Sequence, residues 1–452
     1  MKKFNPIIIL LFLCIIVSGC KKFLDEKPDA KLAVPTSLVD FQALLDSYPA
    51  INNFDPGSGE ISADNYYLTD AVYLALPQET SRRMYTWQKD NLFLPQSNDW
   101  FYSYRPVFTS NTVLEGLHKI TLTAGNHNDY NNVKGQALFV RGKAFLQIAG
   151  LWTSAYDAST ATTQLGIPIR LTSDFNEASV RSNLQETYNQ IITDLSSAAA
   201  LLPITPLQVM RSSKPAAYGL LARTYLNMRQ YDKAGLYADS CLQLNHALLD
   251  YNTLNTAANY PIAQFNMEVI HENKIPVPAP LSNSRAKIDS ALYRSYMAND
   301  LRKTIFFKAS TGGTYAFKGS YEGGGNLFGG IATDEVYLIR AECFARAGKL
   351  TEAADDLNIL LKNRFKTGTF VPISASDQTI LLTAILNERR KELLMRGLRW
   401  MDLKRLNKEG ANITLTRKVN GQTYTLFPND LRYALPIPDD IIQLTGMQQN
   451  PK

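Results

Sequence analysis

The chain has 452 residues, of which 45% are hydrophobic and 19% are charged, and its formal net charge is +6. This length exceeds that of a typical single globular domain, but a helical repeat array escapes that limit because it grows in one dimension. The positive excess is small and forms no Lys/Arg-rich tract, so the composition does not indicate nucleic-acid binding.

The N-terminus predicts export and lipid anchoring. Two lysines precede an apolar run over residues 6–17, which is too short to span a bilayer as a free-standing helix. The run ends at Val17-Ser18-Gly19-Cys20, which resembles the lipobox of bacterial lipoproteins, in which the cysteine is acylated and becomes the new N-terminus. We therefore expect a signal peptide at residues 1–19, lipidation of Cys20 and a tether over residues 20–36. The alternative is an ordinary secretory signal with an incidental cysteine.

The first helix of the folded body is predicted to begin at Ser37. This serine can cap the helix, and Asp40 lies where the helix macrodipole favours an acid. The apolar residues that share one helical face are Leu38, Phe41, Leu44 and Leu45.

Internal repetition predicts the fold class. Tyr218-x2-Leu221-Ala222-x2-Tyr225 matches Tyr337-x2-Arg340-Ala341-x2-Phe344, and alanines follow both at the same spacing, at Ala234 and Ala353. A third copy begins at Leu138, and its second helix is displaced beyond an insert. Aromatic, small and aromatic residues at this spacing are typical of tetratricopeptide (TPR) helix pairs, in which the small residue lets two helices approach closely.

We therefore expect a mainly α, TPR-like repeat scaffold over residues 37–452. The predicted helix pairs lie at about 134–202, 214–246 and 333–363. The alternative is that amphipathic helices share these spacings by chance.

Two long insertions are predicted to form the ligand face. Residues 60–108 are dense in aromatic side chains, and residues 282–330 are loop-like and rich in glycine towards their end. Long insertions of this kind tend to carry binding function. Elsewhere, Cys241 and Cys343 lie in apolar helical patterns and are expected in the core, although a disulfide between them is left open.

In order and spacing, several motifs resemble those of the SusD/RagB family of outer-membrane nutrient-binding lipoproteins. The most specific is Glu388-Arg389-Arg390-x-Glu392-Leu393 followed by Gly397-x-Arg399-Trp400-x-Asp402-Leu403-x-Arg405. The other matching segments are Phe23-Leu24-Asp25, Arg141-Gly142-Lys143-Ala144-Phe145, Gly166-Ile167-Pro168, Ala216-Ala217, Glu335–Glu342, Leu435-Pro436-Ile437-Pro438 and Gln449-Asn450-Pro451.

The resemblance implies a TPR-based helical body that acts as a lid on a SusC-like TonB-dependent barrel of the outer membrane. It also implies a lipid-anchored, surface-exposed protein whose ligand is a glycan or, as in RagB-like members, a peptide. No cofactor or metal is implied.

The candidate ligand contacts lie mainly in the first insertion. Sugar rings stack their C–H faces on flat side chains while amides and carboxylates bind the hydroxyls. Tyr85-x-Trp87-x-x-Asp90, with Asn91 beside it, has this form, and its place is similar to a tryptophan-containing stretch of starch-binding family members. The alternative is that Tyr85 and Trp87 belong to the core, and for Trp87 the two alternatives have equal weight. For Trp100 and Phe101 we favour the core. The further candidates are Asp64, Tyr66, Tyr67, Tyr293, Tyr296 and Tyr315.

Signatures of catalysis are missing from the sequence. It contains no His-Glu-x-x-His, Gly-x-Ser-x-Gly or Walker motif, and its four histidines are scattered. The charges of residues 388–405, including Glu392, Arg399 and Asp402, are expected to form structural ion pairs. We therefore expect a non-catalytic glycan-capture protein. The alternatives are a peptide-binding protein, a surface glycosidase, whose carboxylate pair would need only the right separation in space, and a structural TPR adaptor.

Overall fold

The computed structural model describes residues 34–374 and 377–452. The predicted signal peptide and Cys20 lie outside these residues. The α-helices are α3 (Leu38–Leu45), α4 (Tyr48–Ile51), α5 (Ser58–Ser62), α6 (Asp70–Leu74), α7 (Glu79–Tyr85), α8 (Asp99–Leu117), α9 (His127–Trp152), α10 (Leu184–Leu201), α11 (Lys214–Asn227), α12 (Tyr231–Leu244), α13 (Ser290–Arg294), α14 (Arg302–Ile305), α15 (Thr333–Arg346), α16 (Leu350–Lys362), α17 (Gln378–Glu392), α18 (Arg399–Lys408) and α19 (Asp439–Thr445).

Short strands and 3₁₀ turns fill the space between the helices. The 3₁₀ turns are η2 (Tyr251–Thr253), η3 (Ala279–Leu281), η4 (Thr311–Gly313) and η5 (Leu431–Tyr433). The strands are β1 (Tyr66–Tyr67), β2 (Leu165–Pro168), β3 (Arg181–Asn183), β4 (Val269–His271), β5 (Lys274–Ile275), β6 (Lys287–Ile288), β7 (Phe307–Ser310), β8 (Thr314–Phe317), β9 (Leu327–Phe328), β10 (Ile331–Ala332), β11 (Leu415–Val419) and β12 (Gln422–Leu426). They pair antiparallel in twos, as β1–β6, β2–β3, β4–β10, β5–β9, β7–β8 and β11–β12.

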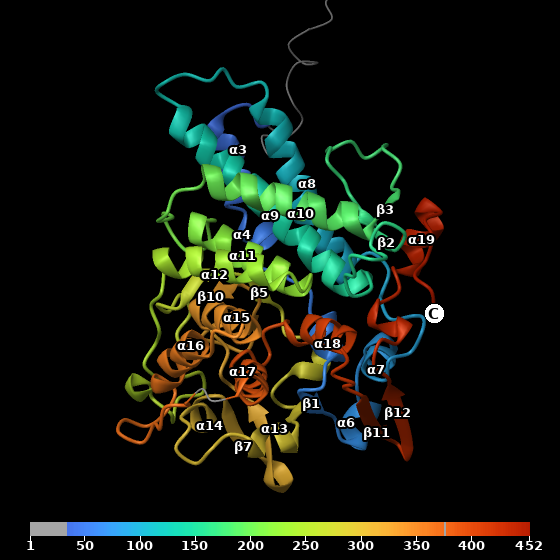
Figure 1. The fold of residues 1–452 in the computed structure, drawn as a ribbon. Coiled ribbons are helices and arrows are strands. Elements are labelled where there is room, and N and C mark those ends of the chain that lie inside the picture. Colours follow the sequence, from blue (N-terminus) through green and yellow to red (C-terminus); the bar gives the residue numbers. More distant parts are fainter. Residues whose placement is uncertain (1–33, 375–376) are drawn as a thin grey trace, which may run out of the picture.

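The mainly α, TPR-like fold class is confirmed. Helices α9 and α10, α11 and α12, and α15 and α16 pack as pairs, and each pair also contacts the next. Helix α8 adds a further layer against α9, and α17 adds one against α15. Figure 1 shows these helices following one another from α8–α10 at one end to α15–α17 at the other, with α6, α7, β11 and β12 gathered beside them.

The small residues of the repeat motif lie at the close contacts between helices. Ala222 and Ala341 are fully buried. A Cβ atom added to Gly142, the matching position of the first pair, would lie 3.0 Å from Leu195 Cγ on α10. The aromatic positions fill the adjoining groove, where the ring of Tyr225 stacks on that of Tyr237 at 5.5 Å and 3°.

The first helix begins where the sequence predicts. Ser37 Oγ accepts a hydrogen bond from the amide of Asp40 (3.2 Å), and Asp40 Oδ2 accepts one from the amide of Ser37 (2.9 Å). This reciprocal capping box satisfies two amides that the helix itself cannot. Phe41 and Leu45 are buried against α8 and α9.

The charges of α17 and α18 form buried ion pairs, as predicted. Arg302 binds Glu392 (2.9 Å), whose other oxygen binds Arg364 (2.7 Å). Arg405 binds both Glu342 of α15 (2.6 Å) and Asp402 (2.8 Å). Because a buried charge without a partner is very costly, these pairs hold α17 and α18 in one arrangement against the repeats.

The turn between α17 and α18 explains the glycine of the specific signature. Gly397 has φ = 71°, a conformation that side chains with a Cβ rarely adopt. Its amide donates to Glu60 Oε2 (3.1 Å), which ties the turn to α5. Burial raises the pKa of Glu60 to about 7.

Two further features bear on the sequence-based expectations. Cys241 and Cys343 are buried and free, as expected of core residues. Among the described residues, no helix combines the length and the apolar character that crossing a membrane requires.

The repeat assignment predicts the effect of overpacking at Ala222. Ala222→Phe should lower the free energy of unfolding by about 1–3 kcal/mol or more, because the helix pair leaves no room for the ring. Denaturant unfolding would measure this change, with Ala257→Phe at an exposed site as the control. An unchanged midpoint for Ala222→Phe would contradict close packing there.

Candidate functional site

Three of the predicted sugar-stacking rings belong to the core. Tyr66, Tyr85 and Trp87 are 3%, 1% and 4% exposed. The guanidinium carbon of Arg417 lies 5.2, 3.8 and 4.6 Å from their ring centres. Of the two alternatives given equal weight for Trp87, the structure agrees with the core. Its indole N–H donates to the carbonyl of Ser62 (2.9 Å), and its ring covers a buried cation.

The polar candidates of this stretch are partly engaged within the protein. Asp64 accepts two hydrogen bonds from Arg399 (2.7 and 2.9 Å), which lowers the pKa of its carboxyl to about 2 even though burial opposes the shift. Asp90 pairs with Arg83. Asn91 is exposed and Tyr67 is half-buried, so these two remain predicted ligand contacts.

The three tyrosines of the second insertion do not act alike. Tyr293 and Tyr315 are half-buried and stack on each other at 3.5 Å and 14°. Tyr296 is buried, and its hydroxyl donates to the carbonyl of Lys391 (2.8 Å) within the ion-pair network. Tyr293 and Tyr315 therefore remain candidates for ligand contact, whereas Tyr296 is a core residue.

A hollow of about 310 Å³ lies among α5, α7, the start of α8 and η3, and we call it the α8 hollow. Its lining residues are Phe54, Asp55, Gly57, Ser58, Ile61, Gln78, Thr80, Ser81, Met84, Leu92, Phe93, Leu94, Ser97, Asn98, Asp99, Tyr102, Pro276, Val277, Pro278 and Ala279. Most belong to the predicted insertion at residues 60–108, but none is a residue that the sequence singled out for ligand contact.

Two stacked rings form the aromatic part of the α8 hollow. Phe54 and Tyr102 lie 4.4 Å apart at an angle of 10°, and both are half-buried. Phe101, which was expected in the core, is 48% exposed beside Tyr102, whereas Trp100 is buried as expected. Phe101 and Trp100 differ in exposure because successive side chains on a helix point about 100° apart. Trp100 therefore faces α9, and Phe101 does not.

The two acidic residues of the α8 hollow are held by donors from the protein. Asp55 accepts a hydrogen bond from Lys143 Nζ (2.6 Å). Asp99 accepts hydrogen bonds from the amide of Ser58 (2.8 Å) and from its hydroxyl. Burial raises the pKa of both carboxyls and lowers the pKa of Lys143.

Behind the stacked rings lies a small cavity with unpaired polar atoms. It shares Phe54, Asp55 and Tyr102 with the α8 hollow and also contacts His271 and Asn273. Asp55 Oδ2, His271 Nδ1 and Asn273 Oδ1 have no hydrogen-bond partner among the described residues. Burial lowers the pKa of His271 to about 3, so its ring is neutral at physiological pH.

The α8 hollow combines flat rings with amide, hydroxyl and carboxyl groups, which is the chemistry that binding a hydroxylated ligand requires. Nothing in residues 34–374 and 377–452 groups three or more His, Cys, Asp or Glu side chains as a metal site. The sequence indicated part of this lining, because Asn98 and Tyr102 lie in the aromatic-rich insertion. However, only the fold brings Phe54 and residues 276–279 beside them.

Two protein families match the chain. Residues 22–226 match a family described as starch-binding and associating with the outer membrane, and residues 333–452 match the SusD family. None of the curated proteins compared with the chain matches it.

Solved structures share the fold. A SusD superfamily protein from Bacteroides thetaiotaomicron has a TM-score of 0.74 at 22% identity, over 92% of this chain and 100% of that one. A SusD superfamily protein from Bacteroides fragilis has a TM-score of 0.72 at 22% identity, over 92% and 99%. A SusD-like carbohydrate binding protein from Bacteroides vulgatus has a TM-score of 0.67 at 21% identity, over 91% and 97%.

The burial of Trp87 predicts a stability effect for its removal. Trp87→Ala should lower the free energy of unfolding by about 3–5 kcal/mol, because it leaves a cavity and uncovers Arg417. Phe427→Ala, at a ring that is 61% exposed, is the control and should change it by no more than about 0.5 kcal/mol. A Trp87→Ala protein that unfolds like the parent but no longer binds glycan would instead support the stacking role.

Proposed function

Because the chain belongs to the SusD/RagB family, we propose that it is a non-catalytic, lipid-anchored protein of the outer-membrane surface that binds a glycan. It passes this ligand to a SusC-like TonB-dependent barrel. The observation that carries the ligand assignment is the α8 hollow, in which stacked rings lie among amide, hydroxyl and carboxyl side chains.

The α8 hollow fits a sugar in both shape and chemistry. At about 310 Å³ it is at the small end of ligand sites, so it would hold one or two sugar units of a longer chain. The half-buried rings of Phe54 and Tyr102 offer apolar contact to the C–H face of a sugar ring. Gln78, Thr80 and Ser81 of the α7 region provide donors and acceptors for hydroxyl groups.

Capture without cleavage is supported by the state of the carboxyls. A glycosidase needs one carboxyl that donates a proton and another that attacks or activates water. In the α8 hollow, Asp55 is paired with Lys143 and Asp99 accepts hydrogen bonds from Ser58. Each carboxyl thus has a protein donor on one of its oxygens.

Anchoring at the membrane rests on the predicted lipidation of Cys20 and on the matching family that is described as associating with the outer membrane. The repeat scaffold supplies a large helical surface for a partner. The barrel partner itself comes from the family resemblance.

The ligand assignment predicts the effect of removing the Tyr102 ring. Tyr102→Ala should weaken the binding of a cognate oligosaccharide at least tenfold, about 1.4 kcal/mol, because one of the two stacked rings is lost. Isothermal titration against an oligosaccharide panel that includes malto-oligosaccharides would measure the affinity, and thermal melting would check the fold.

Tyr315→Ala is the matched control, because it removes a half-buried stacked tyrosine from the other candidate surface. Loss of binding in Tyr315→Ala alone would move the glycan site to Tyr293 and Tyr315. New reducing ends after incubation of the parent protein with the panel would replace capture with hydrolysis.

The transporter assignment predicts co-purification with a barrel. Outer membranes solubilised in mild detergent should yield the protein together with a TonB-dependent barrel, since obligate partners bury large surfaces. Cys20→Ser should release the protein from the membrane fraction. Recovery of the protein alone from solubilised membranes would contradict the partnership, and retention of Cys20→Ser in washed membranes would contradict the anchor.

A further inference from the structure

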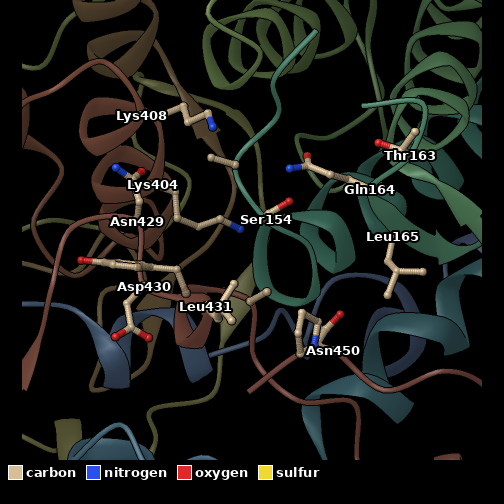
Figure 2. A pocket seen from close by; sticks show the side chains of 14 residues that line it. Ser154, Thr163, Gln164, Leu165, Lys404, Lys408, Asn429, Asp430, Leu431 and Asn450 are labelled. Atoms are coloured by element: carbon tan, nitrogen blue, oxygen red, sulfur yellow. The ribbon is translucent and has the colours of Figure 1, made fainter. Parts of the chain in front are cut away.

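A second cavity of about 370 Å³ lies between the end of α9 and α18 and shares no lining residue with the α8 hollow. Figure 2 shows Lys404 and Gln164 extending towards each other from opposite sides of this cavity, with Ser154 between them. The rim is exposed at Thr163 and Lys408, whereas Lys404 is buried. The cavity is thus open at one side and has a cation within it.

Lys404 is held at the C-terminal end of α9. Its Nζ donates to the carbonyls of Gly150 (2.9 Å) and Thr153 (2.6 Å), where the macrodipole of the 26-residue helix favours a cation. An ammonium group has three N–H donors, and the described residues accept from two of them. Burial is the one cause that lowers the pKa of Lys404, to about 7, and no carboxylate offsets it.

The other charges that line this cavity are neutralised by partners of their own. Lys408 pairs with Asp157 (3.0 Å), and Asp430 pairs with Arg432 (2.7 Å). Tyr433 is the remaining titratable group of the lining, and burial raises its pKa.

On α5 and α11, two of the helices packed against α18, the nearby charges have partners of their own. Glu60 of α5 accepts hydrogen bonds from Asn65 (3.2 Å) and from the amide of Gly397 (3.1 Å), and Arg223 of α11 pairs with Glu335 (2.6 Å). Among the charged side chains that line this cavity, Lys404 is therefore the one without an anionic partner.

A second polar atom in the cavity lacks a partner. The side-chain oxygen Oε1 of Gln164 is buried and has no hydrogen-bond donor among the described residues. Such an atom costs free energy unless a water or a ligand donates to it. Leu165, Leu431 and Tyr433 supply apolar surface beside it.

We propose that this cavity is a separate binding site for a small hydroxylated carboxylate, of the class of sugar acids. The ligand's carboxylate accepts from the free N–H of Lys404, one of its hydroxyls donates to Gln164 Oε1, and the face of its ring lies on the apolar wall. A sugar acid is favoured over a peptide because the cavity is compact and pairs one cation with a hydroxyl acceptor. The site is independent of glycan capture in the α8 hollow, so either assignment can fail alone.

Isothermal titration of the intact protein with D-glucuronate tests the proposal. Glucuronate should bind at least tenfold more tightly than D-glucose or glucuronic acid methyl ester, which lack the charge. Lys404→Met should abolish this preference, whereas Lys366→Met, which removes an equal charge at an exposed site, should not. Gln164→Met keeps Lys404 and its helix contacts, and it should weaken glucuronate binding at least fivefold even if Lys404→Met does not fold.

The pH dependence gives a second readout. The bound carboxylate favours the charged form of Lys404, so binding of glucuronate above pH 7 should take up a proton. As the pH rises above 7, the affinity for glucuronate should therefore fall by up to tenfold per pH unit. Titrations in buffers with different ionisation enthalpies measure this proton uptake.

Three results would overturn the proposal. Equal affinity for glucose and glucuronate would remove the role of Lys404, and equal affinity for diglycine would remove the sugar class. A panel of glucuronate, galacturonate and mannuronate that gives no binding at millimolar concentrations would remove the site. Tyr102→Ala changes the α8 hollow and not this cavity, so a loss of oligosaccharide binding in that variant should leave glucuronate binding unchanged.

Discussion

The arrangement of this protein depends on the requirement that a charge buried in the core is compensated, in most cases by a partner of opposite sign. Arg364 shows how far that requirement reaches: one guanidinium binds Glu268 before β4 and Glu392 at the end of α17, both at 2.7 Å, and donates to the carbonyl of Leu249. Segments far apart in the chain therefore cannot shift independently, because moving any one would leave a charge unpaired in a medium of low dielectric constant. The helix repeats supply the scaffold, and these pairs fix the non-repeating segments on it.

The same constraint explains why three of the candidate rings in the aromatic-rich segment are packed in the core and do not form a ligand surface. Arg417 on β11 reaches into the core and is covered by three rings of the first insertion. Rings that cover a buried cation cannot also stack on a sugar. The rings nearer the surface instead come from Phe54 and from the start of α8, which packs on α9. The dense aromatic stretch of the sequence therefore includes Tyr102 of the α8 hollow, but the rings that the sequence singled out lie elsewhere.

The C-terminal end of α9 is a second point at which distant segments meet. Its last carbonyls are satisfied by Lys404, by the amide of Leu435 (2.9 Å) and by Asn450 Nδ2, which donates to the carbonyl of Trp152 (2.9 Å). These contacts give a physical role to the motifs at residues 435–438 and 449–451, which cap the C-terminal end of α9. Two of these side chains, Lys404 and Asn450, also line the second cavity.

The sequence by itself determined the repeat fold, the cap at Ser37, the burial of Ala222 and Ala341 and the ion pairing of α17 and α18. The first three depend on residues three or four positions apart on one helix, or on a spacing repeated along the chain, and such regularities are visible without coordinates. The dense charges of residues 388–405 indicated ion pairing, but their distant partners Arg302, Glu342 and Arg364 came only from the fold. The tertiary structure alone decided which rings are exposed, that Tyr296 is a core residue, and that Phe54 lies beside Tyr102. Exposure depends on what the rest of the chain covers. The cation that Trp87 covers, Arg417, comes from a strand near the other end of the chain, and no local pattern records that contact.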